Sequence, residues 1–231
     1  MNLYHTTSMN KVLLSIGTVA AFTLHLGAQS AGPAAAPAPA ENPPTLPAPE
    51  PPGIWSAEGV GHGFRAHVKE LGASLGAGIS TDDIGGKETH DMMLGRVYYG
   101  VMLGNPVALD KWYGGNWEFM QEVFGAWQFH PASRYLTGTT SFLRYNFATG
   151  TRWVPFLDGG IGLSATDIAN PDLGSTGEFN GQIGPGLQYF WSDHTALTMQ
   201  YRYMHTSDGG LSSPNQGLNE NILYVGVTWV F

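Results

Sequence analysis

His205 and Ser207 are the residues whose types and spacing most clearly could do chemistry. Residues two apart in an extended strand project from the same face, so an imidazole would lie beside a hydroxyl. This is the minimum arrangement for a nucleophile with its general base. Asp208, Gly209 and Gly210 follow directly, and their backbone N–H groups could stabilise a developing oxyanion. The pair alone is weak support for catalysis, because a histidine near a strand end is commonly an interfacial polar residue.

The composition of the chain that positions these residues indicates contact with something other than water. Charged residues make up only 12% of its 231 residues, while glycine (32 residues) and aromatic residues (12%) are abundant. A soluble domain carries about a quarter charged residues. The net charge of −8 argues against nucleic-acid binding, which needs a basic surface. The absence of cysteine excludes a disulfide framework, a thiol nucleophile and a thiolate metal site.

Two segments before the barrel are predicted to have no part in it. Residues 1–30 are predicted to be a secretory signal peptide, since Lys11 precedes an apolar stretch that ends in small residues. A membrane-spanning helix is the alternative, but the stretch is too short and runs into a Pro/Ala tract. That tract, residues 31–53, is predicted to be a stiff periplasmic linker, because repeated proline rings fix φ and remove hydrogen-bond donors.

Residues 54–231 are predicted to form an all-β domain, an eight-stranded antiparallel transmembrane β-barrel in the outer membrane. The last strand alternates most clearly, with apolar side chains at Leu223, Val225, Val227, Trp229 and Phe231. Seven more segments alternate in the same way, at about 68–79, 91–104, 116–129, 135–147, 152–165, 177–191 and 195–206. No other apolar run is long enough for a transmembrane helix, so a closed barrel would cross the membrane.

Eight charged residues of these segments fall on the face opposite the apolar one. If the apolar face contacts lipid, the interior contains four acids and four bases, which predicts internal ion pairs rather than an open pore. They are Glu70, Arg96, Glu118, Glu122, Arg144, Arg152, Asp158 and Arg202. A soluble β-sandwich or lipocalin-like barrel would bury the apolar face instead. The signal peptide, the aromatic strand ends and the terminal Phe231 favour the membrane.

Two runs of residues in the last four predicted strands are similar to a known family. The first is His-Thr-Ser-Asp-Gly-Gly-Leu at 205–211 with Pro-Asn-Gln-Gly at 214–217. The second is Pro-Phe-Leu-Asp-Gly-Gly-Ile-Gly at 155–162, continued by residues 173–175, 179–180 and 183–187. In order and spacing both runs resemble the lipid A 3-O-deacylase (PagL-like) outer-membrane barrels. The first four predicted strands match that family in architecture alone.

The resemblance implies a site on the lipid-facing wall that removes the ester-linked 3-position acyl chain of lipid A. It assigns Ser207 as the nucleophile, His205 as the base and residues 208–210 as the oxyanion region. The orienting glutamate of the family falls at Asn219, with a carboxylate one residue later at Glu220. A shift of one residue moves a side chain to the other face of a strand, so Glu220 is expected to point inward. Asn219 could accept the ring N–H of His205 but supplies no charge, which leaves open whether the ester hydrolase is impaired.

The leading hypothesis is therefore an esterase with Ser207, His205 and Asn219 as its catalytic residues. Lipopolysaccharide (lipid A) of the outer leaflet and other outer-membrane lipids are the predicted partners, nucleic acid is not, and a homodimer is left open. No metal or organic cofactor is predicted, because the other histidines considered are scattered, at His62, His67, His90, His130 and His194. The alternative is a non-catalytic, OmpA-like structural or adhesive barrel, which Asn219 favours and the retained Ser207 and His205 oppose. The predicted interior ion pairs argue against a porin.

Overall fold

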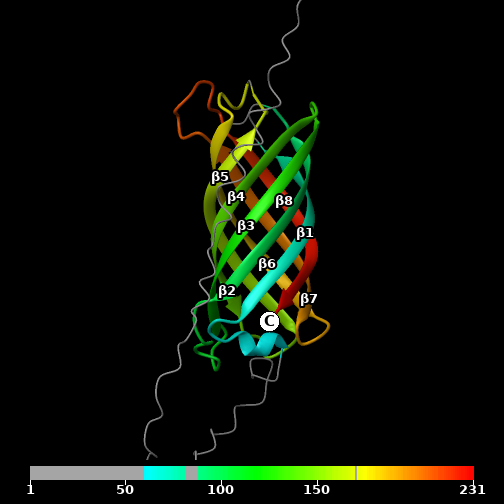
Figure 1. Ribbon diagram of the computed structural model, residues 1–231, viewed down its shortest axis with the longest axis vertical. Helices are drawn as coiled ribbons and strands as arrows, with labels where there is room; N and C mark the ends of the chain where they lie inside the picture. The colour runs from blue at the N-terminus through cyan, green and yellow to red at the C-terminus, as the bar shows by residue number, and fades with distance from the viewer. Residues whose placement is uncertain (1–59, 82–87, 170) are drawn as a thin grey trace, which may run out of the picture. The chain divides into compact units, whose positions relative to one another are not determined.

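Eight antiparallel strands close into a barrel in the computed structural model, which describes residues 60–81, 88–169 and 171–231 (Figure 1). A 3₁₀ helix, η1 (Val60–Phe64), precedes them. The strands are β1 (Lys69–Ser80), β2 (Asp91–Met102), β3 (Gly115–His130), β4 (Arg134–Phe147), β5 (Trp153–Thr166), β6 (Gly177–Phe190), β7 (Thr195–Ser207) and β8 (Leu218–Val230). The predicted fold class is confirmed, whereas the predicted signal peptide and linker, residues 1–53, lie outside the described residues. Within the described ranges, no helix has the length and hydropathy needed to cross a membrane.

Side chains alternate between the outer and inner walls of the barrel, as successive residues of a strand do. On the outer wall apolar side chains are exposed, by 72% for Leu75 and 77% for Ile161. On the inner wall the side chains of Arg144 and Arg202 are fully buried, at 0% exposure. Charges inside and apolar groups outside are the arrangement of a lipid-facing barrel, and this excludes the soluble β-sandwich and the lipocalin-like barrel.

Two arginines link the buried acids of the barrel interior. Arg144 lies 2.9 Å from Glu70 and 3.0 Å from Asp158. Arg202 lies 3.2 Å from Asp158 and 2.8 Å from Glu122. Each guanidinium also stacks on an aromatic ring, at 3.9 Å and 4.1 Å from the ring centroids of Phe156 and Phe142 respectively. The predicted ion pairs are therefore present, and side chains fill the interior at these positions.

The prediction that Arg152 lies inside the barrel was wrong. Arg152 stands just before β5, in the turn that follows β4, where strand parity does not apply. Its guanidinium is half exposed and lies 3.1 Å from Asp193 in the neighbouring turn. Of the eight predicted interior charges, seven are buried, namely the four acids and the arginines at 96, 144 and 202.

The connection between β7 and β8, residues 208–217, lies at the end of the barrel away from the C-terminus. It forms the orange-red loop at the top of Figure 1, beside the connection between β5 and β6. In a barrel with an even number of strands both termini lie at the same end, which is the periplasmic end in bacterial barrels. The candidate residues at the end of β7 therefore lie at the extracellular end.

Candidate active site

β7 places His205 and Ser207 side by side on the outer wall. The alternate residues Met204 and Thr206 point inward and are buried, whereas His205 and Ser207 are partly exposed. The ring Nε2 of His205 lies 3.1 Å from the Ser207 hydroxyl oxygen. The two predicted residues are therefore within hydrogen-bond distance, and no rearrangement is needed to bring them together.

β8 supplies the third residue. Asn219 pairs directly with His205 in the β7–β8 register, and its amide Oδ1 lies 2.6 Å from the ring Nδ1. Because an amide oxygen only accepts hydrogen bonds, Nδ1 must carry the proton and donate it. The lone pair then resides on Nε2 and accepts the hydrogen bond of Ser207. This is the tautomer that a general base for Ser207 requires.

Glu220 does not belong to this arrangement. It pairs with Met204 rather than His205 in the register and is fully buried on the inner wall. The expectation from strand parity, that the neighbouring carboxylate points inward, is therefore confirmed. No bulge lies between Asn219 and Glu220 in the pairing of β7 with β8 that could turn Glu220 toward His205.

A hydrogen-bonded turn directly follows Ser207. The carboxylate of Asp208 accepts the Ser212 hydroxyl and the N–H groups of Gly210, at 2.9 Å, and Leu211, at 3.1 Å. These hydrogen bonds, that of Ser212 first, hold the pKa of Asp208 below its ordinary value. The turn uses the N–H of Gly210, and the N–H of Asp208 itself donates to the side chain of Asn215 at 3.2 Å. Of the three predicted oxyanion donors, the Gly209 N–H is thus the one left available.

Gly217 supports the imidazole from behind, a role that the sequence alone did not assign. Its φ is +83°, and a Cβ atom at this position would lie 2.8 Å from Cε1 of His205. Only glycine combines this backbone conformation with this close approach. Gly217 ends the Pro-Asn-Gln-Gly run at 214–217, and that run was the only signal in the sequence that pointed to it.

The wall around the pair is apolar and partly open. Phe179 of β6 pairs with Ser207 and is exposed, and Gly181 pairs with His205. A Cβ atom at Gly181 would meet no heavy atom within 4 Å, so the outer side of His205 is uncovered there. An acyl chain lying along the wall could therefore reach the Ser207 hydroxyl from the lipid phase.

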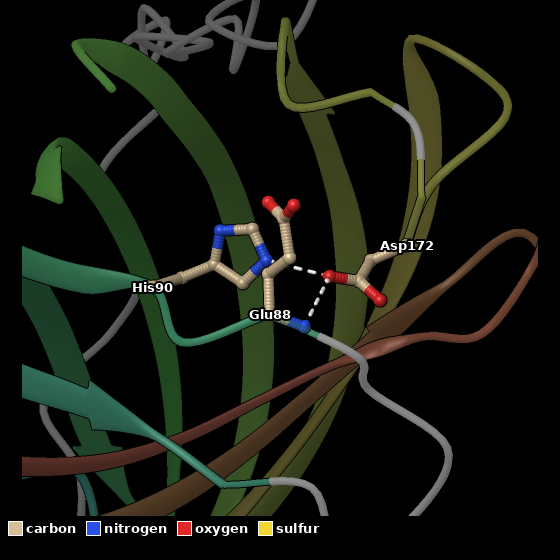
Figure 2. Close-up of side chains that lie close together, drawn as sticks. All are labelled: Glu88, His90 and Asp172. Carbon is tan, nitrogen blue, oxygen red and sulfur yellow. Dashed lines mark hydrogen bonds and ion pairs between the residues drawn. The ribbon is translucent and has the colours of Figure 1, made fainter. Parts of the chain in front are cut away.

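One cluster among the described residues has the donor types of a metal site, although none was predicted. Glu88, His90 and Asp172 bring their ligand atoms within 4.8 Å of one another (Figure 2). They lie outside the Ser207 site and come from two connections, before β2 and between β5 and β6. The sequence shows no sign of this cluster, because Asp172 is 82 positions from His90 and no short metal-binding motif contains both.

Comparison with known proteins finds one matching family model and relatives in two bacteria. The family model described as lipid A 3-O-deacylase (PagL) matches residues 95–228. The lipid A deacylase PagL of Pseudomonas aeruginosa is 34% identical over 83 residues, which cover 35% of this chain and 45% of the relative. The lipid A deacylase PagL of Bordetella bronchiseptica is 28% identical over 123 residues, which cover 49% of this chain and 66% of the relative. This chain thus spans less than two thirds of each relative's length.

The fold has a counterpart among solved structures. The crystal structure of the outer membrane enzyme PagL superposes with a TM-score of 0.50 at 22% identity. The match covers 68% of this chain and 97% of the crystallised chain. At this identity the structural match concerns the fold, and membership of a family rests on the sequence model.

Proposed function

Because this chain belongs to the lipid A 3-O-deacylase (PagL) family, we propose that it hydrolyses an ester-linked acyl chain of lipid A. It is an outer-membrane barrel, and its substrate is present in the outer leaflet that surrounds the extracellular end. The proposed nucleophile is Ser207, with His205 as the base and Asn219 as the residue that orients the ring.

The proposed reaction runs in two steps. The Ser207 hydroxyl attacks the ester carbonyl while Nε2 of His205 takes its proton. The bond between the carbonyl carbon and the sugar oxygen breaks, and His205 returns the proton to that oxygen. Water then attacks the acyl-serine with His205 again as the base, which releases the fatty acid and restores the hydroxyl. The Gly209 N–H is the proposed donor to the oxyanion of each tetrahedral intermediate.

The observation that carries this proposal is the Ser207–His205–Asn219 hydrogen-bond chain on the outer wall, with distances of 3.1 Å and 2.6 Å. An ionisable group facing lipid costs free energy. A purely structural or adhesive barrel has no need to bear this cost, nor to keep a hydroxyl at the imidazole Nε2. The non-catalytic alternative accounts for a histidine near the end of a strand, but it does not account for the hydroxyl and the amide oxygen held at its two ring nitrogens.

Mass spectrometry of lipid A from Gram-negative cells that express the chain tests the proposal. The parent is expected to remove one acyl chain, and Ser207→Ala is expected to leave lipid A intact. Ser141→Ala is the matched control, because Ser141 also lies exposed on the outer wall but pairs with Gln121. A heat-dependent gel shift establishes that each variant is folded in the membrane.

Three results would contradict the proposal. Unchanged lipid A in cells with folded parent protein would favour a structural barrel. Deacylation by Asn219→Glu alone would show a scaffold whose chemistry is switched off in the natural chain. Equal activity of the parent and Ser207→Ala would remove Ser207 from the mechanism.

A further inference from the structure

Glu88, His90 and Asp172 converge at the extracellular end of the barrel (Figure 2). His90 and Asp172 are buried, whereas Glu88 is exposed. Nε2 of His90 lies 2.8 Å from Oδ2 of Asp172, and the backbone N–H of Glu88 donates to the same oxygen at 3.1 Å. The cluster thus contains one imidazole and two carboxylates, with one side open to solvent through Glu88.

The other ring nitrogen of His90 fixes the tautomer. Nδ1 lies 2.9 Å from Oε1 of Gln128, and Nε2 of the same Gln128 amide donates to the carbonyl of Ala132 at 3.0 Å. The second contact fixes which end of the amide faces His90, so Oε1 accepts a proton from Nδ1. In the neutral ring the lone pair therefore resides on Nε2 and faces the carboxylate of Asp172.

Two acceptor atoms that face each other at 2.8 Å need either a second proton on the ring, which makes an imidazolium that donates to Asp172, or a metal cation bound to both atoms. Nitrogen and oxygen ligands lie about 2.0–2.2 Å from a zinc ion, so two ligand atoms of a tetrahedral site are about 3.3–3.6 Å apart. Nε2 of His90 and Oδ2 of Asp172 would have to separate by about half an ångström to share one ion. A histidine that binds metal through Nε2 commonly donates its Nδ1–H to a side-chain or backbone oxygen, which is the role of Gln128 here. We propose that Glu88, His90 and Asp172 bind a divalent transition-metal cation, with Zn²⁺ as the best match.

The donor set favours zinc over calcium and magnesium. The hard cations Ca²⁺ and Mg²⁺ prefer oxygen ligands alone, whereas imidazole suits zinc and similar metals. Three protein ligands and an exposed side leave room for a water molecule in the fourth position of a tetrahedral site. The cation would bind without help from the Ser207 site, so the proposal does not depend on the proposed esterase activity.

Asp172 also links the proposed metal site to the β7–β8 connection. The backbone carbonyl of Asp172 accepts the N–H groups of Gln216, at 2.8 Å, and Gly217, at 3.3 Å. Gly217 in turn contacts His205. A cation held by Glu88, His90 and Asp172 would therefore join the segment before β2 to the β5–β6 connection and steady the β7–β8 connection behind the catalytic histidine.

Zinc titration of the full chain tests the proposal. The barrel is refolded without lipopolysaccharide, which itself binds cations, in a zwitterionic detergent and freed of metal with EDTA that is then removed. Isothermal titration is expected to show one equivalent of Zn²⁺ per chain, and Co²⁺ is expected to give a visible absorption band of a nitrogen–oxygen site. His90→Ala and Asp172→Asn should abolish this binding, and Gln128→Leu should weaken it roughly 10–100-fold.

His130→Ala is the matched control, because His130 also faces a carboxylate, Asp91, at 3.8 Å but is largely exposed. It should bind Zn²⁺ like the parent. If His90→Ala fails to fold, the exposed Glu88→Gln variant should still bind Zn²⁺ more weakly than the parent. No stoichiometric binding, or binding that the His90 and Glu88 variants leave unchanged, would overturn the proposal and identify an imidazolium–carboxylate ion pair. Binding of Ca²⁺ or Mg²⁺ in preference to Zn²⁺ would overturn the assignment to a transition metal.

Discussion

His205 and Asn219 face each other across the β7–β8 ladder, with the ring Nδ1 2.6 Å from the amide oxygen Oδ1. An amide oxygen can fix the ring tautomer as a carboxylate does. It carries no negative charge, however, and so gives less stabilisation to the imidazolium that forms during the reaction. The proposed site therefore has the hydrogen-bond geometry of a triad and lacks one electrostatic contribution.

Asn219→Asp is expected to raise kcat, because it adds the missing charge without changing the shape of the side chain. The gain in kcat should be about 10-fold or more. Its upper limit is about 10⁴-fold, which is the loss in kcat when the aspartate of a serine-protease triad is replaced by asparagine. The rate at which fatty acid is released from lipid A in mixed micelles measures this change in kcat. The matched control is Asn221→Asp, since Asn221 shares the outer face but accepts a hydrogen bond from Tyr201. Equal rates for Asn219→Asp and the parent would argue that the imidazolium is not formed in the limiting step.

Gly217→Ala is expected to lower kcat about 100-fold, the usual result of moving a catalytic group by about 1 Å. The added Cβ would lie 2.8 Å from Cε1 of His205 and push the ring away from Ser207. Gly210→Ala is the control, because Gly210 has a similar φ of +88° but no heavy atom within 4 Å of an added Cβ. Both variants pay the conformational cost of a positive φ, roughly 1–2 kcal/mol. Only Gly217→Ala should lose activity, and a similar loss in both would assign the effect to the loop backbone.

Strand parity explains which side chains could be assigned to the inner or the outer wall from the sequence. Because neighbouring residues of a strand point to opposite walls, the alternation around Arg202, His205 and Ser207 was enough to place each on its side. Parity fails where a strand ends, and Arg152 was misplaced for that reason. Strand parity also does not predict the contacts that residues in the connections make. The approach of His90 to Asp172 and that of Gly217 to His205 are therefore seen only in the structure.

The turn after Ser207 is expected to persist to lower pH than an ordinary aspartate would allow. The pKa of Asp208 is lowered in the folded chain by the Ser212 hydroxyl and by backbone N–H groups. A lowered pKa means that the carboxylate contributes stability above its unfolded pKa, about 3.9, and that this contribution is lost as pH falls through the folded pKa. In an NMR titration the amide shifts of Gly210 and Leu211 should change with a midpoint below the pKa of an unperturbed aspartate. Ser212→Ala should raise that midpoint, and an unaltered midpoint would contradict the assigned cause.

Arg202→Met is expected to destabilise the barrel by about 3 kcal/mol, because it removes the buried cation that Glu122 and Asp158 share. Each acid then keeps one arginine, Arg96 and Arg144 respectively. Arg152→Met, at the half-exposed pair with Asp193, should cost at most about 1 kcal/mol. Guanidinium unfolding in lipid bilayers, followed by tryptophan fluorescence and gel shift, measures both. Similar costs for the two variants would show that the interior ion pairs contribute no more than surface pairs.

Gly181→Leu is expected to lower kcat/KM by filling the uncovered outer side of His205. Gly181 pairs with His205, and a Cβ at this position meets no heavy atom within 4 Å, so the new side chain would occupy the space through which an ester approaches. Gly125→Leu is the matched control, since Gly125 is another open glycine of the outer wall, on β3, and has no part in the proposed site. Both variants should fold, because the added side chains face lipid. Activity on lipid A should therefore fall for Gly181→Leu alone. Unchanged activity in that variant would mean that the acyl chain reaches Ser207 from the side of Phe179 or from the β7–β8 connection.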